Sequence, residues 1–68
     1  MRVFLTVNGK KLMLEVSDMT LNGVLLAMDI NPNGRIISCN DQLFRPEEFS
    51  QLVKDGDVIE IIQFLGGG

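Results

Sequence analysis

The sequence predicts a single small α+β domain in which one β-sheet packs on one helix, in the order strand, strand, helix, strand, short strand, strand. Two observations carry this prediction. Several segments alternate apolar and polar residues with the period of two that is typical of strands. One segment repeats apolar residues at the spacing of an amphipathic helix. Because one helix covers only one face of a sheet, the other face is expected to meet solvent.

The first two strands are predicted to form a β-hairpin. Residues 2–7 and 11–16 each place Val3, Leu5, Val7 or Leu12, Leu14, Val16 on one side and the intervening residues on the other. Asn8 and Gly9 lie between them, and both residue types tolerate the positive φ angles of a tight hairpin turn. The hairpin is therefore expected to turn at these two residues.

A helix is predicted after Thr20, which is a suitable N-cap because its hydroxyl accepts a backbone N–H. The apolar positions of the helical repeat are Leu21, Val24, Leu25 and Met28. Gly23 costs about 1 kcal/mol relative to alanine in a helix interior, so the helix depends on packing. The segment Asn31-Pro32-Asn33-Gly34 is expected to end the helix and turn the chain.

Three further strands are predicted in the second half of the chain. They cover residues 35–40, a short segment at 43–45, and residues 58–64. The turn Asp55-Gly56-Asp57 leads into the last of these strands.

Between the short strand and the last strand, Pro46 is followed by acidic residues, which suits the first turn of a short helix. Leu52 and Val53 are expected to cover the bottom of the core.

The position of Glu60 indicates which face of the last strand meets solvent. It shares a face with Ile62, and burying a glutamate without a partner is costly, so this face is assigned to solvent. The predicted core consists of Val3, Leu5, Val7, Leu12, Leu14, Leu21, Val24, Leu25, Met28, Ile37, Cys39, Ile59 and Ile61. The apolar residues left on the open face are Phe4, Ile36, Ile62 and Phe64. We expect Phe4, Ile62 and Phe64, with Leu65, to form a docking surface beside the start of the C-terminal tail.

The chain ends in Gly66-Gly67-Gly68, directly after an apolar strand. Glycine has no Cβ and keeps most of its backbone freedom, and three extended residues span about 10 Å. A slim arm with one free carboxylate can enter a narrow active site of another protein. The chain is therefore divided into a domain at residues 1–64 and a flexible tail at 65–68. The alternative is a frayed end or an engineered remnant.

Length and charge exclude several classes of function. A chain of 68 residues has no room for both a core and a deep substrate cavity, and it contains no histidine, which disfavours an enzyme. A net charge of −3 disfavours nucleic acid. The sequence has no pattern of a signal peptide and no apolar run of the ~18 residues that span a bilayer. We therefore expect a cytoplasmic protein.

The single cysteine excludes an internal disulfide and fits a reducing compartment. Cys39 lies on the inward face of its strand, so we interpret it as a small core residue and not as a reactive thiol. Asp55 and Asp57 are interpreted as turn residues, because two carboxylates without further ligands are weak evidence for a metal site.

The whole chain resembles the ThiS/MoaD family of sulfur carriers, bacterial relatives of ubiquitin. The resemblance rests on Val7-Asn8-Gly9, Thr20-Leu21 with Leu25-Leu26, the segments 40–49 and 53–60, and the ending 63–68. Within the family, Arg45-Pro46 to Phe49 and the three terminal glycines point to the ThiS branch. The resemblance implies the β-grasp (ubiquitin-like) fold, a five-stranded mixed sheet packed on one helix in the order β-β-α-β-β-β.

The resemblance also implies a chemical cycle for Gly68. A ThiF-like adenylating enzyme uses ATP to convert the Gly68 carboxylate to an acyl-adenylate, while Gly66 and Gly67 enter its active site. Sulfur from a cysteine-desulfurase-derived persulfide then replaces AMP. The resulting thiocarboxylate donates sulfur to a ThiG-like thiazole synthase in thiamine biosynthesis. The protein would be a co-substrate and not an enzyme, with no bound cofactor or metal.

Three alternatives to this function remain open at this point. The first is a MoaD-like carrier for molybdopterin or another sulfur metabolite. The second is a ubiquitin-like modifier that is joined to proteins through Gly68. The third is a β-grasp binding module whose tail is inert.

Overall fold

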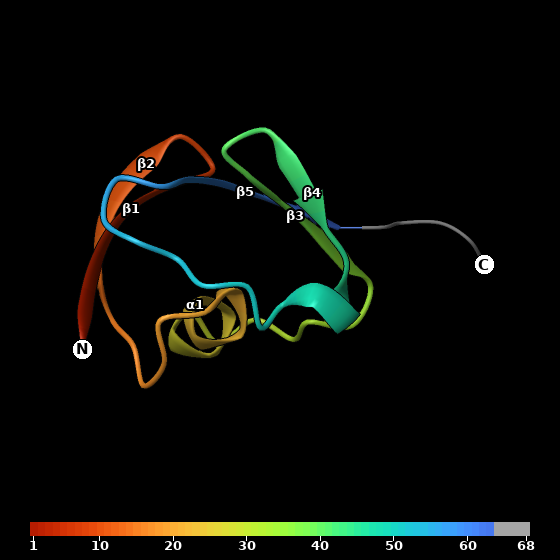
Figure 1. Cartoon of the computed structure of the whole chain (residues 1–68), viewed down its shortest axis with the longest axis horizontal. Helices are drawn as coiled ribbons and strands as arrows, with labels where there is room; N and C mark the ends of the chain where they lie inside the picture. Colours follow the sequence, from red (N-terminus) through yellow and green to blue (C-terminus); the bar gives the residue numbers. More distant parts are fainter. Residues whose placement is uncertain (64–68) are drawn as a thin grey trace.

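The computed structural model describes residues 1–63, and it confirms the predicted order of elements (Figure 1). The strands are β1 (Arg2–Val7), β2 (Lys10–Glu15), β3 (Arg35–Cys39), β4 (Gln42–Phe44) and β5 (Val58–Gln63). The helices are α1 (Leu21–Ala27) and the short 3₁₀ helix η1 (Pro46–Glu48). In this part of the chain, no helix is long and apolar enough to cross a membrane.

The five strands form one mixed sheet in the order β2-β1-β5-β3-β4. β1 and β5 run parallel, whereas the other neighbouring strands are antiparallel. The last strand of the chain therefore lies in the centre of the sheet. Figure 1 shows the sheet curving over α1, which lies on one side of it. The predicted single-helix layer is thus confirmed.

Two tight turns of the same kind connect β1 to β2 and β3 to β4. Asn8 and Gly9 have φ angles of 50° and 83°, which confirms the predicted hairpin turn. Asn40 and Asp41 have φ angles of 51° and 69° and connect β3 to β4. Because Asn40 belongs to this turn, β3 ends at Cys39, one residue earlier than predicted.

Helix α1 begins as predicted and ends earlier than predicted. The Thr20 hydroxyl oxygen accepts a hydrogen bond from the Gly23 N–H at 3.1 Å, which confirms the N-cap. Asp29 has a φ of 58°, its N–H donates to the Leu26 carbonyl, and the Ile30 N–H donates to the Leu25 carbonyl. This left-handed cap closes the helix before the segment 31–34 is reached. The prediction missed it because aspartate, and not the usual glycine, occupies the left-handed position.

The core lies between α1 and the inner face of the sheet. The buried apolar residues are Val3, Leu5, Val7, Val16, Leu21, Val24, Leu25, Ile37, Cys39, Phe44, Phe49, Val53 and Ile59. The other predicted core residues, Leu12, Leu14, Met28 and Ile61, are partly buried against them. Phe49, which the prediction did not include, is the largest fully buried side chain.

The prediction that Leu52 covers the core is wrong, because this side chain is 70% exposed. Its neighbour Val53 is buried, as predicted. Successive side chains of an extended segment point in opposite directions, so only one of the two can face inward.

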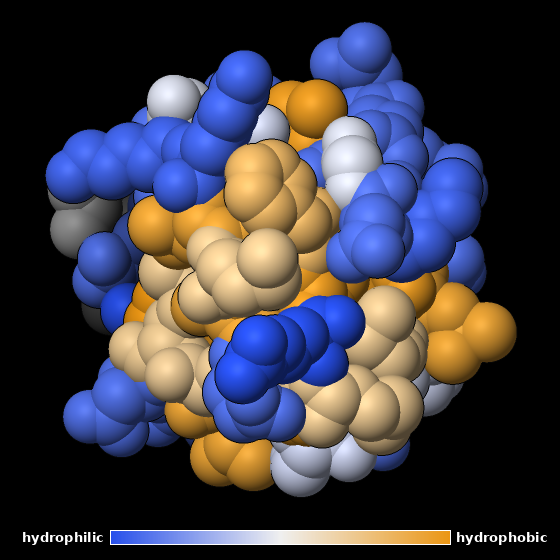
Figure 2. Space-filling model, turned by 90° about the vertical axis from the view of Figure 1, so that its left-hand side faces the viewer, coloured by the Kyte–Doolittle hydropathy of each residue, from blue (hydrophilic) through white to orange (hydrophobic). Residues whose placement is uncertain are grey.

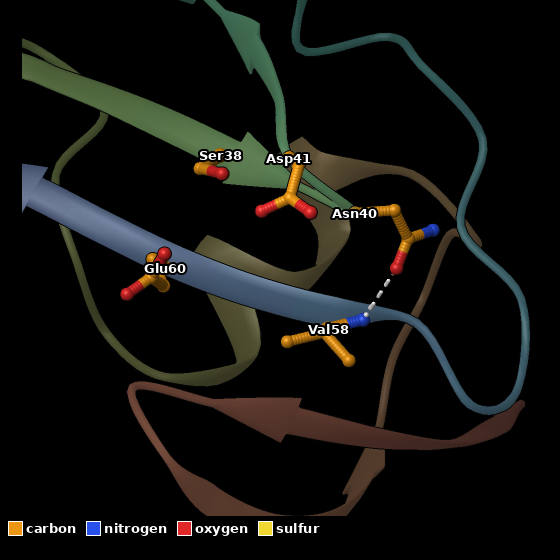
Figure 3. A pocket seen from close by; sticks show the side chains of 5 residues that line it. All are labelled: Ser38, Asn40, Asp41, Val58 and Glu60. Atoms are coloured by element: carbon orange, nitrogen blue, oxygen red, sulfur yellow. Dashed lines mark hydrogen bonds between the residues drawn. The ribbon is translucent and has the colours of Figure 1, made fainter.

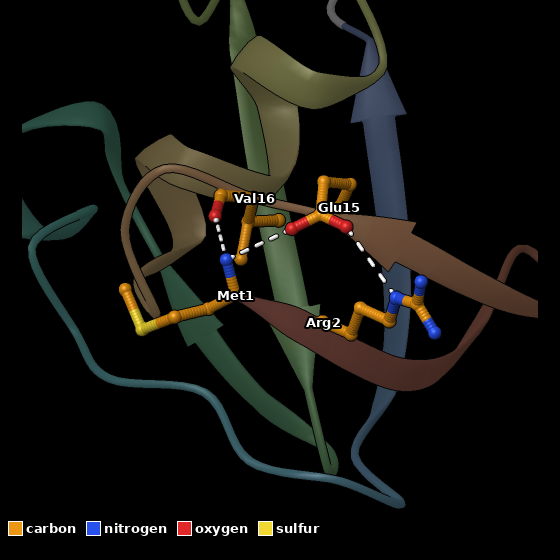
Figure 4. Close-up of polar contacts among 4 residues, drawn as sticks. All are labelled: Met1, Arg2, Glu15 and Val16. Carbon is orange, nitrogen blue, oxygen red and sulfur yellow. Dashed lines mark hydrogen bonds and ion pairs between the residues drawn. The ribbon is translucent and has the colours of Figure 1, made fainter.

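The N-terminus is held against the end of β2 (Figure 4). The Met1 ammonium group donates to Glu15 Oε2 at 2.9 Å and to the Val16 carbonyl at 3.0 Å. The hydrogen bond from the ammonium group and its positive charge lower the pKa of Glu15. These contacts join the start of β1 to the last residue of β2 and to Val16, which follows it.

Candidate functional site

The predicted site residues Phe64, Leu65, Gly66, Gly67 and Gly68 lie outside the described residues. What the structure places is the origin of this segment, at Gln63 on β5. The site is therefore built from the surroundings of Ile61, Ile62 and Gln63.

Asn8 marks the point at which β5 loses its neighbour β1. The Asn8 N–H donates to the Ile59 carbonyl at 2.9 Å, and the Asn8 side-chain oxygen accepts the Ile61 N–H at 2.8 Å. Beyond Ile61, β5 pairs only with β3 among residues 1–63. The backbone edge of Gln63 on the β1 side thus has no strand beside it in this part of the chain. Such an edge can pair with the main chain of another protein.

An apolar patch lies on the open face beside this edge. Ile62 is 44% exposed, and its cross-strand partner Ile36 on β3 is half-buried. A shallow hollow of about 300 Å³ adjoins Ile36 and is lined also by Arg45, Pro46 and Glu47. We call Ile36, Ile62 and these three lining residues the tail-root patch.

Sequence reasoning missed the contribution of residues 45–47 to this patch. Arg45 lies next to Ile36 because β3 and β4 pair in antiparallel register at Ile37 and Phe44. The Arg45 N–H donates to Glu48 Oε1 at 2.9 Å, which fixes the start of η1. The proline followed by two acidic residues was the available signal, but it predicted a short helix and not a surface.

The expected position of Phe4 beside the tail is wrong. Phe4 is on the open face, as predicted, and is 42% exposed. However, the Gly56 N–H donates to the Phe4 carbonyl, so Phe4 lies level with the turn before β5. Ile62 lies near the opposite end of β5, so it is roughly 20 Å from Phe4. The parallel pairing of β1 and β5 causes this separation. A docking role for Phe4 stays a prediction.

Phe4 instead belongs to a separate apolar area on the β1–β2 side. Its cross-strand partner on β2 is Met13, which is 59% exposed. Figure 2 looks onto this side and shows a broad apolar surface interrupted by a strongly hydrophilic side chain. The open face therefore carries two apolar areas at different ends.

The aspartates of the turn before β5 are structural. Asp55 accepts a hydrogen bond from the Phe4 N–H at 2.8 Å. Asp57, which is buried, accepts from the Asn40 amide and from the Lys54 N–H, both at 2.9 Å. This confirms the interpretation of both residues as turn residues. Among the described residues, no three His, Cys, Asp or Glu side chains are close enough together to hold a metal ion.

Electrostatics keep Cys39 in its thiol form. Burial raises the pKa of Cys39, and the negative charge of Asp57 raises it further. For Asp57, burial raises the pKa, but the hydrogen bonds from Asn40 and Lys54 and the charge of Lys54 outweigh it, so the pKa is lowered. Cys39 is thus a buried core residue, as predicted, in surroundings that disfavour the nucleophilic thiolate.

Comparison with known proteins agrees with this architecture. Residues 4–68 match the ThiS family. The structure is similar to the crystal structure of the thiamine biosynthesis protein ThiS from Geobacter metallireducens, with 30% sequence identity and a TM-score of 0.79. The similarity covers 97% of this chain and 100% of that chain. No curated protein sequence matches the chain. The β-grasp fold is confirmed, and the chain belongs to the ThiS family of sulfur carriers.

Proposed function

We propose that this protein carries sulfur for the thiazole ring of thiamine on its C-terminal Gly68. The observation that carries the proposal is the family match, which runs through Gly68. The similar Geobacter protein is a thiamine biosynthesis protein, which supports the same pathway.

The reaction starts from a carboxylate, which is a poor electrophile. A ThiF-like enzyme joins the Gly68 carboxylate to the adenylyl group of ATP and releases pyrophosphate. The terminal sulfur of a cysteine-desulfurase-derived persulfide attacks the activated carbonyl carbon, and AMP leaves, which gives an acyl disulfide. A cysteine thiol of a partner protein then attacks the inner sulfur of this disulfide, forms a new disulfide and releases the thiocarboxylate. The thiocarboxylate is ionised at neutral pH and is a good sulfur nucleophile towards the ThiG-like thiazole synthase.

Catalysis of both steps belongs to the partner proteins. The chain contains no histidine, and its one cysteine is buried with a raised pKa. The chain therefore acts as a co-substrate that the partners bind and modify.

The surroundings of Gln63 support the delivery of the tail to such a partner. The one-sided edge at Gln63 allows main-chain pairing, and the tail-root patch offers apolar surface beside it. We propose that Ile62, Phe64 and Leu65 dock on the partner while Gly66 and Gly67 pass through its narrow entrance. Phe4 would contribute at the far end of the same face.

The test is intact-mass spectrometry of the protein after incubation with the ThiF-like enzyme, ATP and a persulfide source. We expect an exchange of one oxygen for sulfur, localised to Gly68 by fragmentation. Two matched variants accompany the wild type: one lacks Gly67 and Gly68, and the other has one alanine appended after Gly68.

Both variants keep residues 1–66, so their loss of modification reports on the terminal carboxylate. Conversion of the extended variant at the same rate as the wild type would contradict the proposal. An unmodified wild type, together with higher-mass conjugates in cell extract, would favour a protein modifier instead.

A further inference from the structure

The outer edge of β2 carries backbone groups that have no strand beside them. Within residues 1–63, β2 lies at one end of the sheet and pairs only with β1 (Figure 1). Phe4 and Thr6 of β1 direct their N–H groups to the turn before β5, and thus away from β2. Hydrogen-bonded and non-hydrogen-bonded residue pairs alternate along an antiparallel pair of strands. The residues of β2 opposite Phe4 and Thr6 therefore direct their own N–H and C=O groups outward.

These outward-facing residues are Lys11, Met13 and Glu15. Met13 is the cross-strand partner of Phe4, Lys11 is that of Thr6, and Glu15 continues the same alternation. In the part of the chain that the structure describes, no side chain forms a hydrogen bond with the backbone of these three residues. The outer edge of β2 is therefore open along its length.

Other backbone donors that lack a neighbouring strand are occupied by side chains. The Asn8 side-chain oxygen accepts the Ile61 N–H, and the Asn40 side-chain oxygen accepts the Val58 N–H. Figure 3 shows the second contact beside a shallow hollow of the open face, which is lined also by Ser38, Asp41 and Glu60. The edge of β2 differs from these places, and an open edge can pair with another strand.

The sequence of β2 is complementary to itself when two copies run antiparallel and meet at Met13. Lys11 then lies opposite the partner's Glu15, and this pair occurs twice because of the two-fold axis. On the inner face, the half-buried Leu12 lies opposite the partner's Leu14. The outward N–H and C=O groups pair in the same register, with two hydrogen bonds for each hydrogen-bonded pair.

Other registers lose this match. Centring the pair on Lys11 or on Glu15 brings like charges face to face, and the offsets between them leave a charge opposite Met13. Lysine on an edge strand ordinarily prevents pairing between copies. In the register centred on Met13, each lysine instead meets a glutamate, so the charges favour the contact.

The side chains that this register requires are accessible. Met13 is 59% exposed, and both Lys11 and Glu15 are exposed. Glu15 already accepts hydrogen bonds from Met1 and Arg2. A carboxylate has about four acceptor positions, so a lysine of a second copy can join these donors. The broad apolar surface of Figure 2 lies on the same side of the molecule.

We propose that two copies of this chain pair through β2, antiparallel and centred on Met13, so that their sheets become one continuous sheet. The contact joins one strand to one strand, so the dimer is weak and reversible. β5 lies beyond β1 as seen from β2, and the two-fold axis directs the two β5 strands to opposite ends of the joint sheet. Both tail origins therefore stay accessible, and the dimer does not depend on the sulfur-carrier function.

Sedimentation equilibrium of the full chain tests the association. We expect a monomer–dimer equilibrium with a Kd on the order of 0.1 mM. Met13→Pro should stay folded but monomeric, because the N–H that it removes points outward and makes no bond to β1. Circular dichroism checks that this variant is folded. A wild type that remains monomeric at about 2 mM would overturn the proposal.

Charge reversal tests the register. Lys11→Glu places glutamates opposite each other and should weaken the dimer about tenfold or more. The matched control is Lys10→Glu, which changes net charge equally but lies opposite the partner's Val16 and should change the Kd by no more than about threefold. An equal mixture of the Lys11→Glu and Glu15→Lys variants restores opposite charges at both pairs and should dimerise again. Equal weakening by the two lysine variants, or no recovery in the mixture, would exclude this register.

NMR-detected hydrogen exchange locates the contact. As the protein concentration rises, exchange should slow at the amides of Lys11, Met13 and Glu15. The amides of Leu12 and Leu14 face β1 and should change little. Concentration-dependent protection at β4 or on the open face, without protection at β2, would show that a different surface associates and that the proposal is wrong.

Discussion

Gly23 lies in the first turn of α1, where helix propensity alone favours alanine. The structure gives the reason for glycine. A Cβ at this position would overlap the carbonyl oxygen of Asp18, which passes close to the helix backbone. A tertiary contact that the sequence does not show thus requires glycine at this position, although glycine has a low helix propensity.

We predict that Gly23→Ala destabilises the protein by about 1–3 kcal/mol, because backbone atoms must move to make room for the methyl group. Chemical denaturation measures the change. The control is Asn22→Ala, an exposed neighbour in the same turn, which should be neutral or slightly stabilising. A Gly23→Ala protein as stable as the wild type would contradict the close approach at Asp18.

Asp57 connects three segments, because its carboxylate accepts hydrogen bonds from Asn40 and Lys54 just before β5. Since the folded pKa is lowered, Asp57 stabilises the protein above its ordinary pKa. This contribution is lost as the pH falls below about 4 and through the folded pKa.

We predict that Asp57→Asn costs roughly 1–3 kcal/mol at pH 7, since it removes charge-assisted hydrogen bonds of a buried group. The difference between variant and wild type should shrink at pH 3. Urea denaturation at both pH values measures it. An equal difference at the two pH values would show that the carboxylate charge contributes nothing.

At the scale of elements, the end of β5 depends on a side chain in a turn. The oxygen of Asn8 accepts the Ile61 N–H at the position where another residue of β1 would have paired. Asn8 also has a φ of 50°, which asparagine and glycine both tolerate. The same residue thus makes the hairpin turn and supports the strand that leads to the tail.

We predict that Asn8→Gly keeps the hairpin but speeds hydrogen exchange at the Ile61 amide, because its acceptor is lost. The loss in stability should be about 1 kcal/mol. NMR-detected exchange measures the effect. Asn8→Asp retains an acceptor oxygen and should keep the protection. If Asn8→Gly and wild type exchange alike at Ile61, the contact does not hold β5.

Two elements differ from their predictions for local reasons. Helix α1 stops at Ala27 because Asp29 adopts the left-handed conformation that sequence reasoning reserves for glycine. Leu52 points outward because its neighbour Val53 takes the inward position. In the first case the sequence contains a residue that ends the helix, but its left-handed conformation is not evident from its type. In the second case the sequence contains two adjacent apolar residues, but it does not show which of them faces the core.

At the scale of the whole molecule, we expect the proposed docking on the open face to depend most on the tail-root patch. We predict that Ile62→Ala raises the KM for adenylation more than Phe4→Ala does, because Ile62 lies next to the origin of the tail and Phe4 lies roughly 20 Å away. Both side chains are exposed, so the two variants are matched. Pyrophosphate exchange measures both. A larger effect of Phe4→Ala would move the docking surface to the β1–β2 side.

The sequence by itself determined the order and approximate positions of the strands, both faces of β5, the turn at Asn8-Gly9 and the N-cap at Thr20. These features depend on local periodicity and on the conformational preferences of single residues, which are readable in the chain. Family resemblance added the fold and the proposed role of Gly68, and the ThiS family match supports the resemblance.

Only the tertiary structure decided which residues share a neighbourhood. A period of two gives the face of a side chain but not its neighbours across the sheet, because strand order and register are set by pairing between distant segments. The parallel pairing of β1 and β5 therefore separated Phe4 from Ile62. The pairing of β3 with β4 and β5 gathered Ser38, Asp41 and Glu60 into one hollow, although nothing in their spacing connects them.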